Sequence, residues 1–107
     1  MFRKQSDGEQ RQLLEGVGLQ TLAWGERTLM ARFRLLAGAK IPPHRHPHEQ
    51  IGCLTRGRLR LVVAGEEHTA SPGDAWCIPP DTEHEAEALE DAEALEVFAP
   101  VRDDYLP

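Results

Sequence analysis

The feature that most limits the fold is the near absence of helix-period patterns along the chain. Short runs alternate apolar and polar residues instead, and Gly, Pro and Asp interrupt them at close intervals. The runs are Leu29–Leu35, Gln50–Thr55, Arg58–Val63, Glu67–Ala70, His84–Leu89 and Glu93–Phe98. Alternation places successive side chains on opposite faces of a strand, and many short strands are typical of a small barrel or sandwich. The sequence therefore predicts an all-β fold.

The acidic stretch from Glu83 to Glu96 also favours strands over a helix. Its glutamates Glu83, Glu85 and Glu87 stand at every second position, which places them together on one face of an extended chain. We therefore expect an exposed strand face in this stretch.

Composition narrows the class of protein. The 107 residues suit one domain, and a net charge of −6 without a lysine- or arginine-rich run argues against nucleic acid as a partner. The apolar stretches are too short to cross a membrane, and the polar segment 1–12 lacks the apolar part of a secretory signal. We expect a cytoplasmic protein in which Cys53 and Cys77 are reduced thiols.

Four side chains from two parts of the chain form the strongest functional signal. His44 and His46 are two residues apart, so on an extended chain both imidazoles face the same side. Gln50 keeps that parity, and His84 comes from a separate predicted strand. Three imidazoles and an amide oxygen suit a divalent transition metal, namely Mn, Fe, Co, Ni or Zn. His48 shares the parity and is an alternative ligand or supporting group, although Pro47 is expected to turn it aside.

The spacing of these residues resembles the two motifs of the cupin superfamily. Gly38, His44-x-His46, Gln50 and Gly57 follow the first motif, and the second is matched by Gly73, Pro79 and His84. The resemblance implies a jelly-roll barrel, the double-stranded β-helix of cupins. It implies one domain over residues 1–107, with a core barrel at about 27–98 and the N-terminal strands and C-terminal tail packed on it. It also implies a homodimer, because small cupins often pair through an outer sheet.

The chain departs from the family pattern at Gln50, where glutamate is usual, and at Asp81, where the second motif usually has glycine. Because a neutral amide replaces an anionic ligand, a bound divalent ion would keep its full charge. Such a site favours Lewis-acid chemistry on an anionic substrate over oxygen activation.

A narrower resemblance comes from the segment 46–52 and from the tail after residue 89. His-Pro-His-Glu-Gln-Ile-Gly and Phe-Ala-Pro-Val-Arg-Asp-Asp-Tyr are similar to the KdgF family of small cupins. That family linearises 4,5-unsaturated uronates to keto forms, so the resemblance implies a small anionic sugar acid as ligand. Carried over by position, the family's residues near the substrate become Glu96, Phe98 and Arg102. Glu96 replaces an aspartate of the family, and its carboxylate reaches one methylene further.

Other interpretations remain open at this point. The chain is also consistent with a metal-dependent dioxygenase, a sugar isomerase or a non-catalytic cupin that binds a small ligand. From composition alone, Phe98 is a core residue, Glu96 is exposed and Arg102 forms a salt bridge in the tail. His68 is expected to be solvated, and Trp24 and Trp76 are expected to pack in the barrel.

Two short turns predict hairpins. Arg56-Gly57 is expected to join its flanking strands directly. The segment 90–92 is expected to be a three-residue loop that pairs the following strand with the preceding one, which would turn His84 and Glu96 to the same interior.

Overall fold

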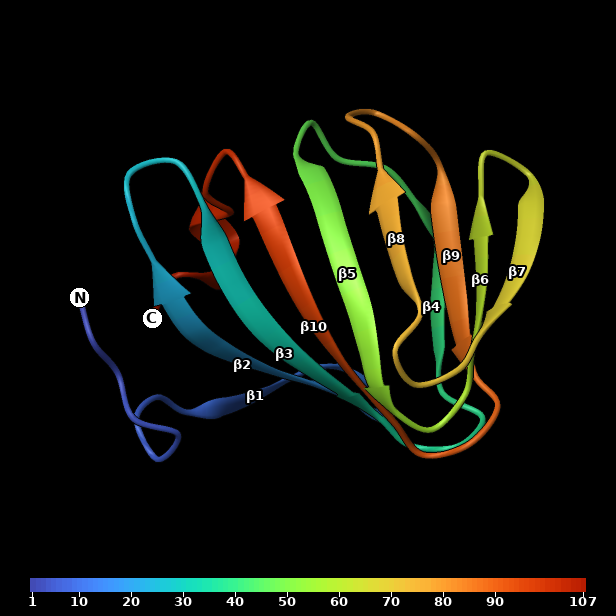
Figure 1. Cartoon of the computed structure of the whole chain (residues 1–107), viewed down its shortest axis with the longest axis horizontal. Coiled ribbons are helices and arrows are strands. Elements are labelled where there is room, and N and C mark those ends of the chain that lie inside the picture. Colours follow the sequence, from blue (N-terminus) through green and yellow to red (C-terminus); the bar gives the residue numbers. More distant parts are fainter.

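The computed structural model describes all 107 residues as ten strands and one 3-10 helix (Figure 1). The elements are β1 (Gln10–Leu14), β2 (Val17–Trp24), β3 (Leu29–Leu35), β4 (Lys40–His44), β5 (Glu49–Arg56), β6 (Leu59–Val63), β7 (Glu66–Ala70), β8 (Ala75–Ile78), β9 (His84–Ala88), β10 (Ala92–Ala99) and η1 (Asp103–Tyr105). The predicted all-β fold is confirmed. The acidic stretch lies in β9 and β10, as expected. No helix is long and apolar enough to span a bilayer.

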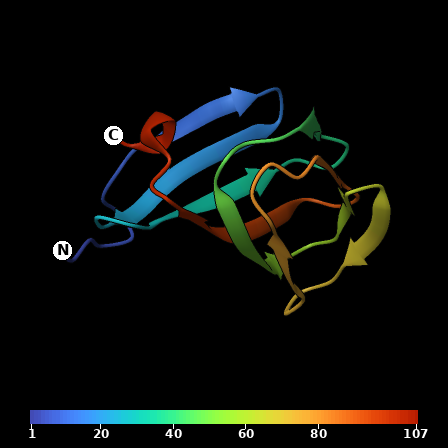
Figure 2. The same cartoon turned by 90° about the horizontal axis from the view of Figure 1, so that it is seen from above.

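The strands form two antiparallel sheets that face each other across a common interior (Figures 1 and 2). The larger sheet has the order β1-β2-β3-β10-β5-β8, and the smaller sheet has the order β4-β9-β6-β7. From β3 onward the chain repeatedly crosses between the sheets. This is the jelly-roll arrangement predicted for the chain.

Both predicted hairpins are wrong, for the same reason. β5 pairs with β10 and β8, whereas β6 pairs with β7 and β9, so Arg56-Gly57 is a corner between the sheets. Gly57 has φ of +83°, and a Cβ there would collide with the backbone at Asp91, so the corner requires glycine. The link from β9 to β10 is also a crossing, because β9 pairs with β4 and β6 and β10 pairs with β3 and β5.

Strand alternation sets which side chains face the interior. Along β10, alternate residues are buried, and this inner set includes Glu96 and Phe98. Phe98 packs with Phe33 and Tyr105, with ring centroids 6.4 and 5.4 Å away. The apolar core therefore continues directly into the region where the predicted site residues lie.

Candidate metal centre and adjoining cavity

The three predicted histidine ligands converge at one end of the interior. His44 ends β4 and lies opposite His84 at the start of β9, while His46 comes from the loop before β5. One ring nitrogen from each histidine lies within 4.8 Å of the others. Gln50 on β5 completes the group, so the two sheets contribute to the same centre.

Each imidazole is oriented by a backbone carbonyl. Nδ1 of His44, His46 and His84 lies 2.8, 3.0 and 2.8 Å from the carbonyl oxygens of residues 42, 48 and 82. A carbonyl only accepts, so each Nδ1 carries the proton and donates it. Each Nε2 therefore presents a lone pair, and this tautomer of the imidazole is the one that can bind a metal through Nε2. His48 thus serves the centre through its carbonyl, and its ring is not part of the three-histidine group.

The contact between His46 and Gln50 tests whether the site fits a cation. The Gln50 side-chain nitrogen donates to Glu96 Oε2 at 3.0 Å, so Gln50 Oε1 must face His46 Nε2, also at 3.0 Å. Because His46 Nδ1 already carries the ring proton, this contact joins two lone-pair atoms. His84 Nε2 is also buried without a partner. A divalent cation satisfies all of these atoms, and 3.0 Å suits two neighbouring ligands of one ion.

The electrostatics favour neutral imidazoles. The pKa of His84 is lowered to about 4, mainly by burial and also by the neighbouring His44, His46 and Arg102, while the hydrogen bond to residue 82 acts in the opposite direction. Burial is also the main cause that lowers the pKa of His46. Both rings are therefore unprotonated near neutral pH, as metal binding requires.

Glu96 lies beside this centre, fully inside the barrel. Its carboxylate accepts hydrogen bonds from Gln50 at 3.0 Å and from Trp76 Nε1 at 3.2 Å. Burial raises its pKa to about 7, although both hydrogen bonds act in the opposite direction. The alternative in which Glu96 is exposed is wrong, since only 6% of the residue is accessible.

Two residues that support Glu96 were not singled out from the sequence for this role. Gly52 lies opposite both Glu96 and Trp76 in the larger sheet, and a Cβ there would collide with both side chains. Trp76 packs against the core as expected, but its indole N–H also fixes the carboxylate. A glycine inside an apolar strand signals close approach, and a buried indole needs an acceptor, so both signals were present in the sequence.

Arg102 follows β10 and is held on two sides. Its Nε and Nη2 donate to Asp104 at 3.1 and 2.7 Å, and the guanidinium stacks over Tyr105 at 4.1 Å and Phe98 at 5.1 Å. The expected salt bridge in the tail therefore exists, and Arg102 also lines the interior cavity. Asp104 occupies one edge of the guanidinium, which leaves the end at Nη1 for another anion.

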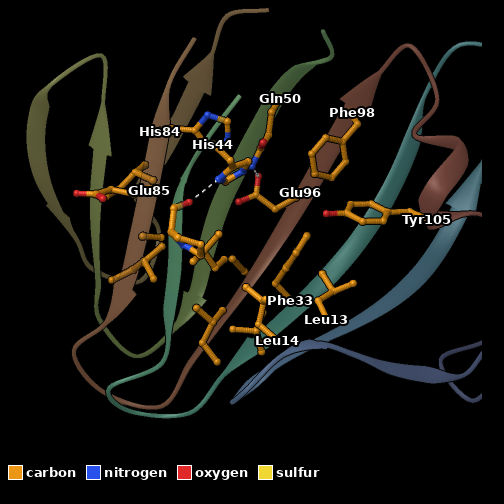
Figure 3. Close-up of a pocket in the computed structure, with 18 of the residues that line it drawn as sticks. Leu13, Leu14, Phe33, His44, Gln50, His84, Glu85, Glu96, Phe98 and Tyr105 are labelled. Carbon is orange, nitrogen blue, oxygen red and sulfur yellow. Dashed lines mark hydrogen bonds between the residues drawn. The ribbon is translucent and has the colours of Figure 1, made fainter. Parts of the chain in front are cut away.

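These groups surround a cavity of about 230 Å³ (Figure 3). His44, Gln50, His84 and Glu96 gather at one end, and Leu13, Leu14 and Phe33 lie at the other. The cavity is thus lined by three of the four predicted metal ligands together with Glu96, Phe98 and Arg102. His68 on β7 is exposed and lies outside it, as expected.

Comparison with known proteins agrees with this geometry. The family model described as "Cupin domain" matches residues 31–99. The pectin degradation protein KdgF of Dickeya dadantii (strain 3937) is 29% identical over 97 residues, covering 89% of this chain and 88% of that protein. The structure of KdgF from Halomonas sp. superposes with a TM-score of 0.93 at 31% identity, covering 99% of this chain and 98% of the other.

A second structure supports the fold alone. The RmlC-like cupin from Shewanella frigidimarina has a TM-score of 0.93 at 23% identity, covering 98% of this chain and 95% of the other. Together with the match over residues 31–99, these comparisons identify the chain as a member of the cupin domain family, similar to the KdgF proteins.

Proposed function

We propose that this protein is a metal-dependent enzyme that linearises 4,5-unsaturated uronates to 4-deoxy-5-keto uronates. The observation that carries the proposal is that the lone pairs of three histidines and Gln50 point to one centre. The buried carboxylate of Glu96 and the free guanidinium end of Arg102 lie next to that centre. The similarity to KdgF of Dickeya dadantii, a pectin degradation protein, supports a sugar acid as the substrate. The ligand set suits a divalent ion such as Mn, Fe, Co, Ni or Zn.

Arg102 would bind the substrate carboxylate. Its Nε edge is occupied by Asp104, so the carboxylate would meet the Nη1 and Nη2 end. Stacking on Tyr105 and Phe98 limits rotation of the guanidinium, which fixes the direction from which the carboxylate approaches. Phe98 is almost fully buried and forms part of the cavity wall, so it keeps water from that side.

Glu96 would move the proton that the reaction requires. In the ring form, the anomeric hydroxyl loses its proton, the C1–O5 bond breaks, and an enol remains at C5. A proton added to C4 then gives the 5-keto product, so the reaction is an isomerisation without redox change. A carboxyl group with a pKa of about 7 can accept and return a proton near neutral pH. The Gln50 and Trp76 hydrogen bonds hold its two oxygens in place.

A divalent ion bound by the three histidines and Gln50 would supply Lewis-acid polarisation of a substrate oxygen. No ligand of the set is anionic, so the ion would keep a double positive charge. This favours the stabilisation of negative charge that develops on an enol oxygen.

The test is the decay of ultraviolet absorbance from the conjugated double bond of an unsaturated uronate. We expect decay with metal-replete protein and its loss after chelation or in Arg102→Ala. Arg58→Ala is the matched control, because Arg58 is exposed and lies outside the cavity. Uronate that binds without any decay would contradict the proposed activity. Decay that requires molecular oxygen would indicate an oxygenase instead.

A further inference from the structure

The cavity differs sharply between its two ends. One end carries His44, His84, Gln50 and Glu96, as described above, and Arg102 also lines the cavity. The other end carries Leu13, Leu14 and Phe33, whose side chains contain no polar atoms, and Figure 3 shows this separation.

This apolar end offers little to a sugar hydroxyl. A hydroxyl placed against these side chains would lose its water and gain no hydrogen bond, which is unfavourable. An apolar group placed there would gain by leaving water. The shape and chemistry of the cavity therefore favour a ligand with two unlike ends.

The edge strand β1 is built to extend the apolar wall. The register between β1 and β2 shifts between Gln12 and Leu14, where the ladder contains a bulge. In a regular strand, Leu13 and Leu14 would face opposite sides, but here both line the cavity. Leu13 and Leu14 remain 37% and 42% accessible to solvent, so the two leucines form an apolar edge where the cavity meets solvent.

The opposite end is suited to an anion. Arg102 stacks over Phe98, whose ring centroid lies 5.9 Å from that of His46, and Asp104 leaves its Nη1 end unoccupied. We propose that the cavity binds carboxylates that carry an apolar body, with the carboxylate at Arg102 and the apolar body against Leu13, Leu14 and Phe33. This inference stands without the uronate reaction. Combined with the proposed function, on which this narrower form rests, it specifies the substrate as a uronate whose ring hydroxyl carries a short acyl ester.

Calorimetric titration of the full chain, supplied with Mn²⁺, with acetate, butyrate and hexanoate tests this inference. Burial of each added methylene is expected to tighten binding by up to about fourfold, until the cavity is filled. A Leu13→Ser/Leu14→Ser double variant should flatten this rise. Leu89→Ser should retain it, since Leu89 is similarly exposed at 45% but does not line the cavity.

Arg102→Gln separates the two ends of the ligand. It should weaken all three acids by a similar factor while the rise with chain length persists, because the variant changes only the carboxylate end. Equal affinity for the three acids, no binding of any of them, or a rise unaffected by the leucine changes would overturn the inference. A rise with chain length without uronate turnover would refute the proposed reaction alone, and turnover without a rise would refute this inference alone.

Discussion

Replacing Glu96 with glutamine should change how stability depends on pH. In the folded protein the pKa of Glu96 is raised from 4.5 to about 7, mainly by burial. At 1.36 kcal/mol per pH unit, this difference corresponds to roughly 3 kcal/mol that opposes ionisation inside the barrel. Glutamine stays neutral and offers a donor and an acceptor, so Glu96→Gln resembles the protonated protein at every pH.

The sign follows from the direction of the pKa change. The unfolded chain ionises near pH 4.5 and the folded carboxyl only near pH 7, so the native state holds the extra proton between these values. Glu96 therefore contributes stability that is present below pH 4.5 and is lost as pH rises to about 7. His84 acts in the opposite direction, because its pKa is lowered to about 4, and its contribution is lost as pH falls below 6.5.

Urea unfolding of metal-stripped protein at pH 5 and pH 8 measures the effect. The histidine contribution is common to both proteins, so it cancels in the difference between Glu96→Gln and the parent chain. We expect this difference to shift in favour of the variant by about 2–3 kcal/mol from pH 5 to pH 8. Glu90→Gln, at an exposed turn, should show no such shift. A difference that is the same at both pH values would refute the assigned burial of this carboxylate.

Three further predictions concern the residues around Glu96 and the metal ligands. Gly52→Ala should destabilise the protein by about 1–3 kcal/mol in urea unfolding, because its methyl group collides with Trp76 and Glu96; an unchanged midpoint would contradict the packing. Trp76→Phe keeps an aromatic ring but removes the donor to Glu96, so carboxyl titration followed by infrared spectroscopy should give a higher Glu96 pKa, and an unmoved titration would argue against this hydrogen bond. Added Zn²⁺ should raise the melting temperature of the parent chain and of His68→Ala but not of His84→Ala; an equal rise in all three would place the metal elsewhere.

The convergence of the candidate side chains follows from two kinds of sequence information. His44 and His46 share a face because they are two residues apart, and motif spacing brought Gln50 and His84 to the same centre. Alternation also predicted the strands β3, β5, β6, β7, β9 and β10. These strands and the face shared by His44 and His46 depend on short stretches of chain, whereas the place of His84 came from the spacing of the family motifs.

The errors concern pairing between distant strands. A short turn has the same composition whether the chain reverses within one sheet or crosses to another, so the corners at Gly57 and Asp91 were predicted as hairpins. The support of Glu96 by Trp76 requires the registers of β10, β5 and β8 together. The homodimer, the cytoplasmic location and the single domain over residues 1–107 stay predictions.

Because the candidate ligands come from both sheets, a bound ion would link the two layers of the sandwich. His44 and His84 belong to the smaller sheet and Gln50 to the larger one, so the layers would be held together while all three bind the same ion. Metal affinity should then report how firmly the layers are closed. A substitution that loosens either layer far from the histidines should weaken metal binding without touching a ligand.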